Sequence, residues 1–254
     1  MTPVFDAVAS SFDRFRALPS GVPEAIRSAI FAATGIGLPA RVLDLGAGTG
    51  RIGKAFVTAG DSYAGIDTSF AMLREFQALS PEGFLAQANG SRLPFADGAF
   101  DLVLLMHVLS GTHDWQEIVK ECRRVARIGG AVVVGHTLRS ESGIDKQLKR
   151  KLRSILEAMG VVLHRPGESR NEALAWLESN STRCIHAQAA SWSVRPSARE
   201  FLSRHRSGAR FAALPAAVQE IAIGKLAEWA VEVFGSLDAT FDEQHSFELD
   251  IFEF

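Results

Sequence analysis

The sequence has few cysteines, no long apolar run and no excess of positive charge. Its 254 residues contain only two cysteines, Cys122 and Cys184, which lack the spacing of metal ligands. We therefore expect reduced thiols, no structural metal and a cytoplasmic location. The longest apolar stretches, such as AVVV at 131–134, are far too short to span a bilayer.

Two further absences narrow the function. The formal net charge is −2, so we expect no broad attraction to nucleic acid or to an acidic membrane. The first sixteen residues, MTPVFDAVASSFDRFR, carry two aspartates and lack the basic start and apolar run of a secretory signal. What remains is a globular protein with 47% hydrophobic and 22% charged residues.

Residues 23–137 alternate helix-like and strand-like segments, which predicts an α/β unit with a parallel sheet. Asp114 and Glu117 have the spacing of a capping box, and Gly129-Gly130 predicts a turn before the last of these strands. Helices are expected at about 24–34, 50–59, 69–79 and 114–126, and strands at 41–45, 63–67, 83–89, 100–108 and 131–136.

The composition changes after His136. Residues 139–180 are charged and helical in pattern, and they interrupt the alternation as an inserted lid would. The segment 183–194 reads as a strand, and 246–254 alternates apolar and acidic residues like an antiparallel closing strand. Helices are expected between them, at 197–205 and 216–235.

A glycine loop, VLDLGAGTG at 42–50, follows the first predicted strand and opens a helix. Its glycines at 46, 48 and 50 let the backbone approach a ligand at the carboxyl edge of the sheet. A dinucleotide-binding loop would have glycine at position 51, where this chain has Arg51. A dehydrogenase is therefore the weaker interpretation.

Two acidic residues accompany the loop. The carboxylate of Asp44 would repel a pyrophosphate but attract a ligand that bears an ammonium and a sulfonium, as S-adenosylmethionine does. Asp67 ends the second predicted strand, 19 residues beyond Gly48, where a carboxylate can accept both ribose hydroxyl protons.

These motifs resemble those of the class I, Rossmann-like methyltransferases that act on small molecules. The resemblance covers about residues 40–136 and rests on VLDLGAGTG, GID, ANGSRLPFADGAFDLVLLMHVL and RVARIGGAVVV. It implies a mostly parallel sheet of seven strands with an antiparallel last strand and helices on both faces. We expect one domain over 1–254, with the amino-terminal segment and cofactor-binding half at 1–137, the helical lid at 138–182 and the completing strands and helices at 183–254.

The resemblance also implies a cofactor site for S-adenosylmethionine. Asp44 and the loop backbone would hold the methionine part, Asp67 the ribose and Met72 the adenine, while Asn89 stands where the family usually has an acid. The cofactor-binding residues expected are Arg16, Asp44, Gly46, Ala47, Gly48, Asp67, Thr68, Met72, Asn89, Gly90, Ser91 and His107.

Methyl transfer needs alignment more than a catalytic base. His107 and His136 each follow the apolar core of a strand, and either could contact the acceptor, remove a proton or serve a structural role. His107 is the candidate catalytic residue, because the resemblance places it beside the cofactor. Arg16 could pair with the methionine carboxylate, and Phe5 and Phe12 could cover the site or simply pack on the core.

Three hypotheses about the function remain open. We expect a small molecule that enters between the lid and the sheet edge. A basic stripe on the lid helix would instead fit tRNA if it were more than a solvated face, and a protein that binds the cofactor without catalysis is the third possibility. The stripe consists of Lys146, Lys149, Arg150 and Arg153.

Overall fold

The computed structural model describes residues 6, 9–13, 16–110, 112, 114–161, 168–206, 211 and 214–254. Seven strands form one mixed sheet in the order β3-β2-β1-β4-β5-β7-β6. Strands β1 to β5 pair in parallel, and β7 pairs antiparallel with both β5 and β6. The predicted mostly parallel, seven-stranded sheet is confirmed. The strands are β1 (Arg41–Leu45), β2 (Ser62–Asp67), β3 (Phe84–Gln87), β4 (Phe100–Met106), β5 (Ala126–Arg139), β6 (Arg183–Val194) and β7 (Glu243–Glu253).

The strand order places a crevice beside β1. The chain adds β2 and β3 on one side of β1 and β4 and β5 on the other. Ligands of open α/β sheets bind at such a reversal point, at the carboxyl ends of the strands. The glycine loop leaves β1 at this point.

Helices cover both faces of the sheet. On one face, α2 (Val22–Thr34), α3 (Gly53–Thr58) and α4 (Phe70–Leu79) bury Ile26, Ile30, Phe56 and Phe76 against the strands. On the other face, α5 (Trp115–Val125) packs through Val119 and Cys122. Both cores are continuous and apolar, because β1 and β4 are buried on both sides.

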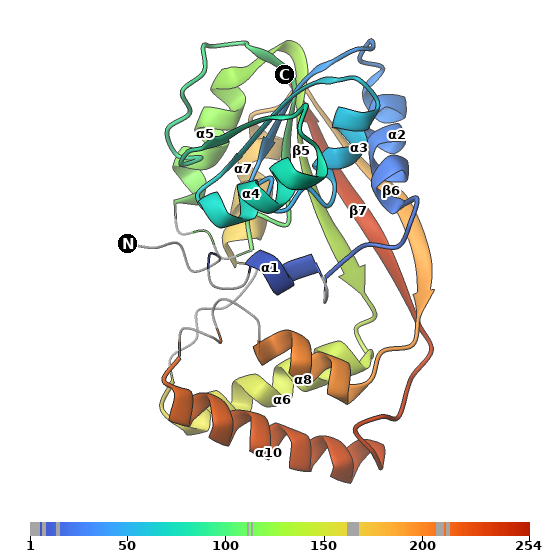
Figure 1. Ribbon diagram of the computed structural model, residues 1–254. Helices are drawn as coiled ribbons and strands as arrows, with labels where there is room; N and C mark the ends of the chain where they lie inside the picture. The colour runs from blue at the N-terminus through green and yellow to red at the C-terminus, as the bar shows by residue number, and fades with distance from the viewer. Residues whose placement is uncertain are drawn as a thin grey trace.

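Three helices form a separate layer beyond the carboxyl edge of the sheet (Figure 1). They are α6 (Ile144–Ala158), α8 (Ala198–Arg206) and α10 (Ala216–Phe234). Leu148, Phe201 and Leu226 are fully buried between them and form a core of their own. Within the described part of the chain, no helix combines the length and the apolar character needed to cross a bilayer.

The predicted lid at 138–182 does not form one unit in the structure. Only α6 joins the separate helical layer, whereas α7 (Glu168–Ser179) packs on the sheet beside α5. Ala173 and Leu177, one helical turn apart, are both completely buried in the core of the sheet. Two buried apolar residues at this spacing tie α7 to the sheet, and α8 and α10 from beyond residue 182 complete the layer.

Two local predictions are also wrong. Gly129-Gly130 lies inside β5, where the pairing register with β4 shifts, so the expected turn is an irregularity within a longer strand. Asp114 precedes α5 but makes no side-chain cap, and Glu117 pairs with Lys120 instead of completing a capping box.

Candidate functional site

The glycine loop is tied to the end of β2. The backbone N–H groups of Gly46 and Ala47 both donate to the carbonyl of Ile66, at 2.8 and 3.0 Å. Gly46 has a φ of 80°, and a Cβ there would lie 2.6 Å from Val108 Cγ2. Only glycine fits this conformation and this spacing, so the loop backbone comes close to the space above it.

A cavity of about 330 Å³ opens at the loop, within the range of small-ligand sites. It brings together ten of the predicted cofactor residues, whereas Arg16 and Ser91 are not among the described residues that line it. Those ten are Asp44, Gly46, Ala47, Gly48, Asp67, Thr68, Met72, Asn89, Gly90 and His107.

Asp44 is a buried carboxylate with one unused oxygen. Tyr63 Oη donates to Asp44 Oδ2 at 2.7 Å, while Oδ1 has no partner among the described residues. Burial raises the pKa of Asp44 to about 7, against the hydrogen bond from Tyr63, which lowers it. A buried acceptor of this kind at a cavity wall fits a cationic ligand group that donates hydrogen bonds.

Asp67 is held rigidly at the end of β2. Its Oδ2 accepts from Gly48 N at 2.9 Å, and its Oδ1 accepts from Ser69 N at 2.8 Å. Burial raises the pKa of Asp67 although these backbone donors lower it. Each oxygen has a second lone pair, which leaves this carboxylate able to accept from a ligand at the cavity.

The predicted adenine side is more closed than expected. Met72 is only 2% exposed and packs against Ala9 of α1 (Ala9–Phe12). Asn89 Oδ1 accepts from Ser91 N at 3.0 Å, so part of its acceptor capacity closes a turn. Ser91 thus serves as a backbone donor within the loop and not as part of the cavity wall.

The amino-terminal segment covers the loop. Ser69 Oγ donates to Asp6, and Thr49 Oγ1 donates to Asp13 Oδ1 at 2.6 Å. Phe12 lines the cavity as the sequence suggests, whereas Phe5 lies outside the described residues. Arg16 stacks on Phe12, with its guanidinium 4.6 Å from the ring centre, and its buried Nη1 has no partner among the described residues.

Sequence reasoning missed Arg51 as a site residue. It lines the cavity, contacts Phe12 at 5.2 Å and donates to the carbonyl of Arg16. Its pKa is lowered by burial, and the nearby cation Arg139 lowers it further. Its position one residue after the loop is the signal that could have placed it here. Thr49, Thr112 and Asp114 also line the cavity without having been predicted.

His107 ends β4 at the mouth of the cavity. It is the one described residue other than glycine with a positive φ, 61°, and its N–H donates to Gly135 O at 2.8 Å. Desolvation by the surrounding protein lowers the pKa of His107 to about 3, with smaller contributions from the positive charges of Arg51 and Arg139. The ring is therefore neutral at pH 7, close to Thr137 Oγ1 at 3.4 Å.

The other predicted histidine does not join it. His136 contacts Arg170 Nη2 at 3.1 Å and is not among the described residues that line the cavity. Within the described ranges, no group of three or more His, Cys, Asp and Glu side chains could hold a metal ion.

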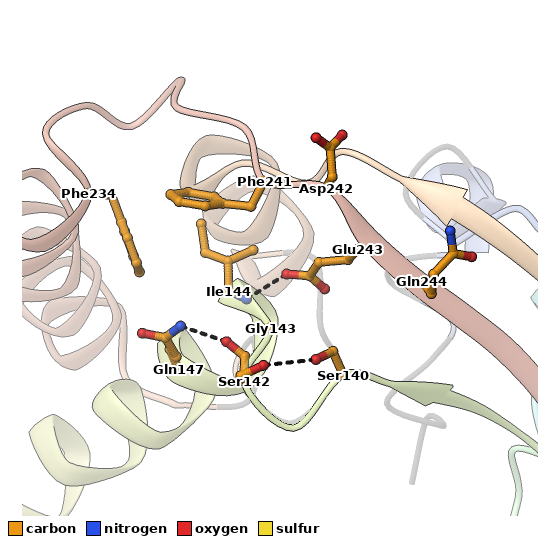
Figure 2. A pocket seen from close by; sticks show the side chains of 10 residues that line it. All are labelled: Ser140, Ser142, Gly143, Ile144, Gln147, Phe234, Phe241, Asp242, Glu243 and Gln244. Carbon is orange, nitrogen blue, oxygen red and sulfur yellow. Dashed lines mark hydrogen bonds between the residues drawn. The ribbon is translucent and has the colours of Figure 1, made fainter.

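A second cavity, also about 330 Å³, lies where β5 passes into α6 (Figure 2). Its one fully buried carboxylate, Glu243, accepts from Ile144 N at 2.6 Å and caps the start of α6. Gln147 and Ser142 bond to each other across its rim at 2.7 Å. These groups are occupied in holding the helical layer on the sheet, so the first cavity is the functional candidate.

Part of the chain resembles known methyltransferases. Residues 43–134 match the family model described as a methyltransferase domain. The chain is 33% identical over 132 residues to a demethylmenaquinone methyltransferase of Streptomyces griseus and 34% identical over 137 residues to one of Thermobifida fusca. Each match covers 52% of this chain, which spans 57% and 58% of those relatives.

Solved structures share the fold over nearly the whole chain. The YcgJ protein of Bacillus subtilis has a TM-score of 0.59 at 19% identity, over 89% of this chain and 97% of its own. A SAM-dependent methyltransferase of Thermotoga maritima has a TM-score of 0.51 at 15% identity, over 98% and 99%. Residues 43–134 thus resemble a methyltransferase domain, and these solved structures share the Rossmann-like fold of the chain.

Proposed function

We propose that this chain transfers a methyl group from S-adenosylmethionine to a small-molecule acceptor. The observation that carries the proposal is Asp44, whose buried Oδ1 lacks a partner among the described residues and borders the loop cavity. A cationic group with N–H donors would satisfy both the oxygen and its charge. An ammonium fits this need, whereas a pyrophosphate would be repelled.

The other residues of the cavity divide the cofactor between them. Asp67 accepts from the ribose hydroxyls, and Asp44 receives the ammonium. Met72 packs on the adenine, which Asn89, Gly90 and Thr68 border. Gly46, Ala47 and Gly48 present backbone to the methionine part, and Arg51, which lines the cavity, would pair with its carboxylate.

When bound, S-adenosylmethionine supplies an electrophilic methyl group. The chain then has to align an acceptor with that methyl and exclude water. The amino-terminal segment serves exclusion, because its contacts through Asp6, Asp13 and Phe12 close it over the loop. His107 contacts the acceptor as a neutral ring; a pKa of about 3 makes it a hydrogen-bonding partner and a weak proton acceptor.

The named relatives support a small acceptor. Two of them are demethylmenaquinone methyltransferases, so a quinone-like ring is one acceptor class to test. The family model ends at residue 134, before α6 and α8. The helices of the helical layer thus lie outside the matched segment, and the comparison says nothing of what they bind.

Calorimetric titration with S-adenosylmethionine, S-adenosylhomocysteine and NAD tests the proposal. We expect both sulfur ligands to bind and NAD not to bind. Asp67→Ala removes the ribose acceptor and should weaken binding by at least about tenfold. Gly48→Val should also weaken it, since it places a branched side chain at a φ of 57° on the cavity wall.

A matched control keeps this test specific. Asp97→Ala removes a carboxylate that is 82% exposed and lies away from the cavity, so it should leave binding unchanged. Tight NAD binding, or no response to either sulfur ligand from the folded protein, would overturn the proposal. Cofactor binding without turnover on any acceptor would favour the non-catalytic alternative.

The macromolecular alternative has lost its main support. Lys146 pairs with Glu141, and Lys149 lies among Arg139, Asp145 and Arg204. Of the four residues of the predicted basic stripe, Lys146 is thus engaged in an ion pair and Lys149 faces other charged groups of the chain. Salt-dependent binding of bulk tRNA that is lost in a Lys149→Glu, Arg150→Glu double variant would restore this alternative.

A further inference from the structure

Cations from five separate segments lie near one another, and two of them, Arg51 and Arg139, act on His107. Arg51 contacts the carbonyl of Arg16, and Arg16 Nη2 donates to the carbonyl of Arg204 at 3.4 Å. Arg139 and Lys149 interact electrostatically with Arg204. We call these five residues, Arg16, Arg51, Arg139, Lys149 and Arg204, the cationic cluster.

The carboxylates around the cluster are fewer and already engaged. Asp145 receives Arg204 Nη2 at 2.6 Å and pairs with Arg139 Nε at 3.2 Å. Asp13 faces Arg51 and accepts from Thr49, while Glu243 faces Arg139 and caps α6. Five cations thus face three described carboxylates, which leaves an excess of positive charge.

The excess of positive charge lowers the pKa values of residues within the cluster. Burial, together with Arg204, Arg51 and Arg139, lowers the pKa of Arg16 to about 10. Desolvation of the ammonium by the surrounding protein, together with Arg139 and Arg204, lowers the pKa of Lys149 to about 8. Lys149 makes no hydrogen bond or salt bridge with a described residue, although its side chain is accessible. A bound anion would relieve this repulsion.

The cluster adjoins the place where a methyl group would be transferred. Arg51 lines the loop cavity together with His107. Arg139 follows Thr137 by two residues on β5, on the same side of the strand, and Thr137 contacts His107. Lys149 and Arg204 approach from the helical layer, on α6 and α8.

We propose that the methyl acceptor is an anionic small molecule whose carboxylate or phosphate is bound by Arg51, Arg139 and Lys149, with the atom to be methylated beside His107. This inference rests on the proposed function and names the acceptor's chemistry. One carboxylate of the cofactor, paired with Arg51 or Arg16, neutralises a single charge. The excess of two leaves room for a second anion, and Lys149 lies on the side of the helical layer, where the acceptor enters.

Binding to the chain loaded with S-adenosylhomocysteine tests the inference without turnover. The probes are matched pairs, benzoate with benzamide and phenyl phosphate with phenol, together with inorganic phosphate. We expect the anion of at least one pair to bind about tenfold or more tightly than its neutral partner. A larger difference in affinity within the benzoate pair would indicate a carboxylate acceptor, and a larger difference within the phenyl phosphate pair would indicate a phosphate acceptor.

Two neighbouring substitutions on α6 sharpen the result. Lys149→Gln should weaken anion binding about tenfold and leave affinity for S-adenosylhomocysteine unchanged, and Lys149→Arg should restore it. Arg150→Gln, which removes an exposed charge one residue away, should have no effect. Failure of S-adenosylhomocysteine to bind would overturn the proposed function. Normal cofactor binding with no anion bound, or with anion and neutral partner bound alike, would overturn the anionic acceptor.

Discussion

At the scale of single residues, one small cavity brings together groups of opposite charge. The carboxylates of Asp44 and Asp67 line it together with the guanidinium of Arg51 and the neutral ring of His107. The two carboxylates have raised pKa values because of burial, while the pKa of His107 is lowered. The protonation of each of these groups should therefore respond to the charge of a ligand that binds in the cavity.

Cofactor affinity should depend on pH through Asp44. A cationic ligand binds the ionised carboxylate, so affinity should rise as pH increases through about 7 and fall, up to about tenfold per pH unit, below about pH 6. Calorimetry at pH 7 in buffers of different ionisation enthalpy should show release of about half a proton. For the free protein the sign is opposite: ionising Asp44 costs stability as pH rises from about 4 through 7.

The variant Tyr63→Phe provides the control for this prediction. It removes the one side chain that donates to Asp44, which raises the pKa of Asp44 further. The pH at which affinity reaches half its maximum should move upward, while affinity well above that pH changes little. A midpoint unaffected by Tyr63→Phe would assign the pH dependence to another group.

The sequence predicted most of the polar residues that line the loop cavity because they are local. Asp44 and the glycines belong to one continuous motif, and Asp67 ends the neighbouring strand. The cationic cluster was not predicted, since its members are up to 188 residues apart and meet only through the folded helical layer. Arg51 illustrates the difference: its position was known, but its neighbours Arg16 and Arg139 were not.

At the scale of elements, the glycine loop depends on the helix behind it. A Cβ at Gly50 would lie 2.2 Å from Phe76 Cδ2 of α4, at a φ of 84°. Gly60, just after α3, has a similar φ of 82° but open space around it. Substitutions at these two positions therefore distinguish the effect of backbone strain from the effect of crowding against Phe76.

Gly50→Ala should destabilise the protein more than Gly60→Ala. Strain alone costs about 1–2 kcal/mol at either position, and crowding against the fully buried Phe76 adds about 1–3 kcal/mol at Gly50. Urea unfolding of both variants measures the difference. Equal losses of unfolding free energy would show that α4 shifts freely to make room.

The hydrophobic pattern predicted where the elements lie, but it did not predict the ends of all of them. Strand 41–45 and strand 183–194 have the predicted bounds, because apolar runs or alternation begin and end there. β5 is longer than predicted at both ends: Gly129-Gly130 is absorbed by a register shift, and pairing with β7 extends the strand to Arg139. Such extension depends on a partner strand more than 100 residues later.

At the scale of the whole molecule, Asp145 joins three parts of the fold. It lies on α6 and is 1% exposed, yet it binds Arg204 of α8 and Arg139 at the end of β5. Its pKa is lowered: burial raises it, but Arg204 and Arg139 outweigh burial. The carboxylate thus holds the helical layer together and to the sheet.

Asp145→Asn should lower the free energy of unfolding by up to about 3 kcal/mol at pH 7, because it leaves two partly buried guanidinium groups without their carboxylate. In the parent protein this contribution is present above about pH 4 and is lost as pH falls through the lowered pKa. Denaturant unfolding at several pH values should therefore show the two proteins converging in acid. A constant difference down to pH 2 would contradict the assignment.

The helical layer was the part of the fold that the sequence placed least accurately. Its charged composition set 139–180 apart, but composition alone does not tell which of two helices reaches the sheet. Ala173 and Leu177 decide it for α7, and they are too few to stand out as a pattern. A layer assembled from α6, α8 and α10 requires contacts that no local signal contains.

The place of β7 in the sheet also has a consequence for how the protein is made. Of the seven strands, β7 is synthesised last, yet it lies between β5 and β6 and pairs with both. Until residues 243–253 leave the ribosome, both older strands present open edges, which are templates for pairing with other chains. Translation order and strand order disagree here, so the nascent chain stays vulnerable to aggregation until β7 has been made and has paired with both strands.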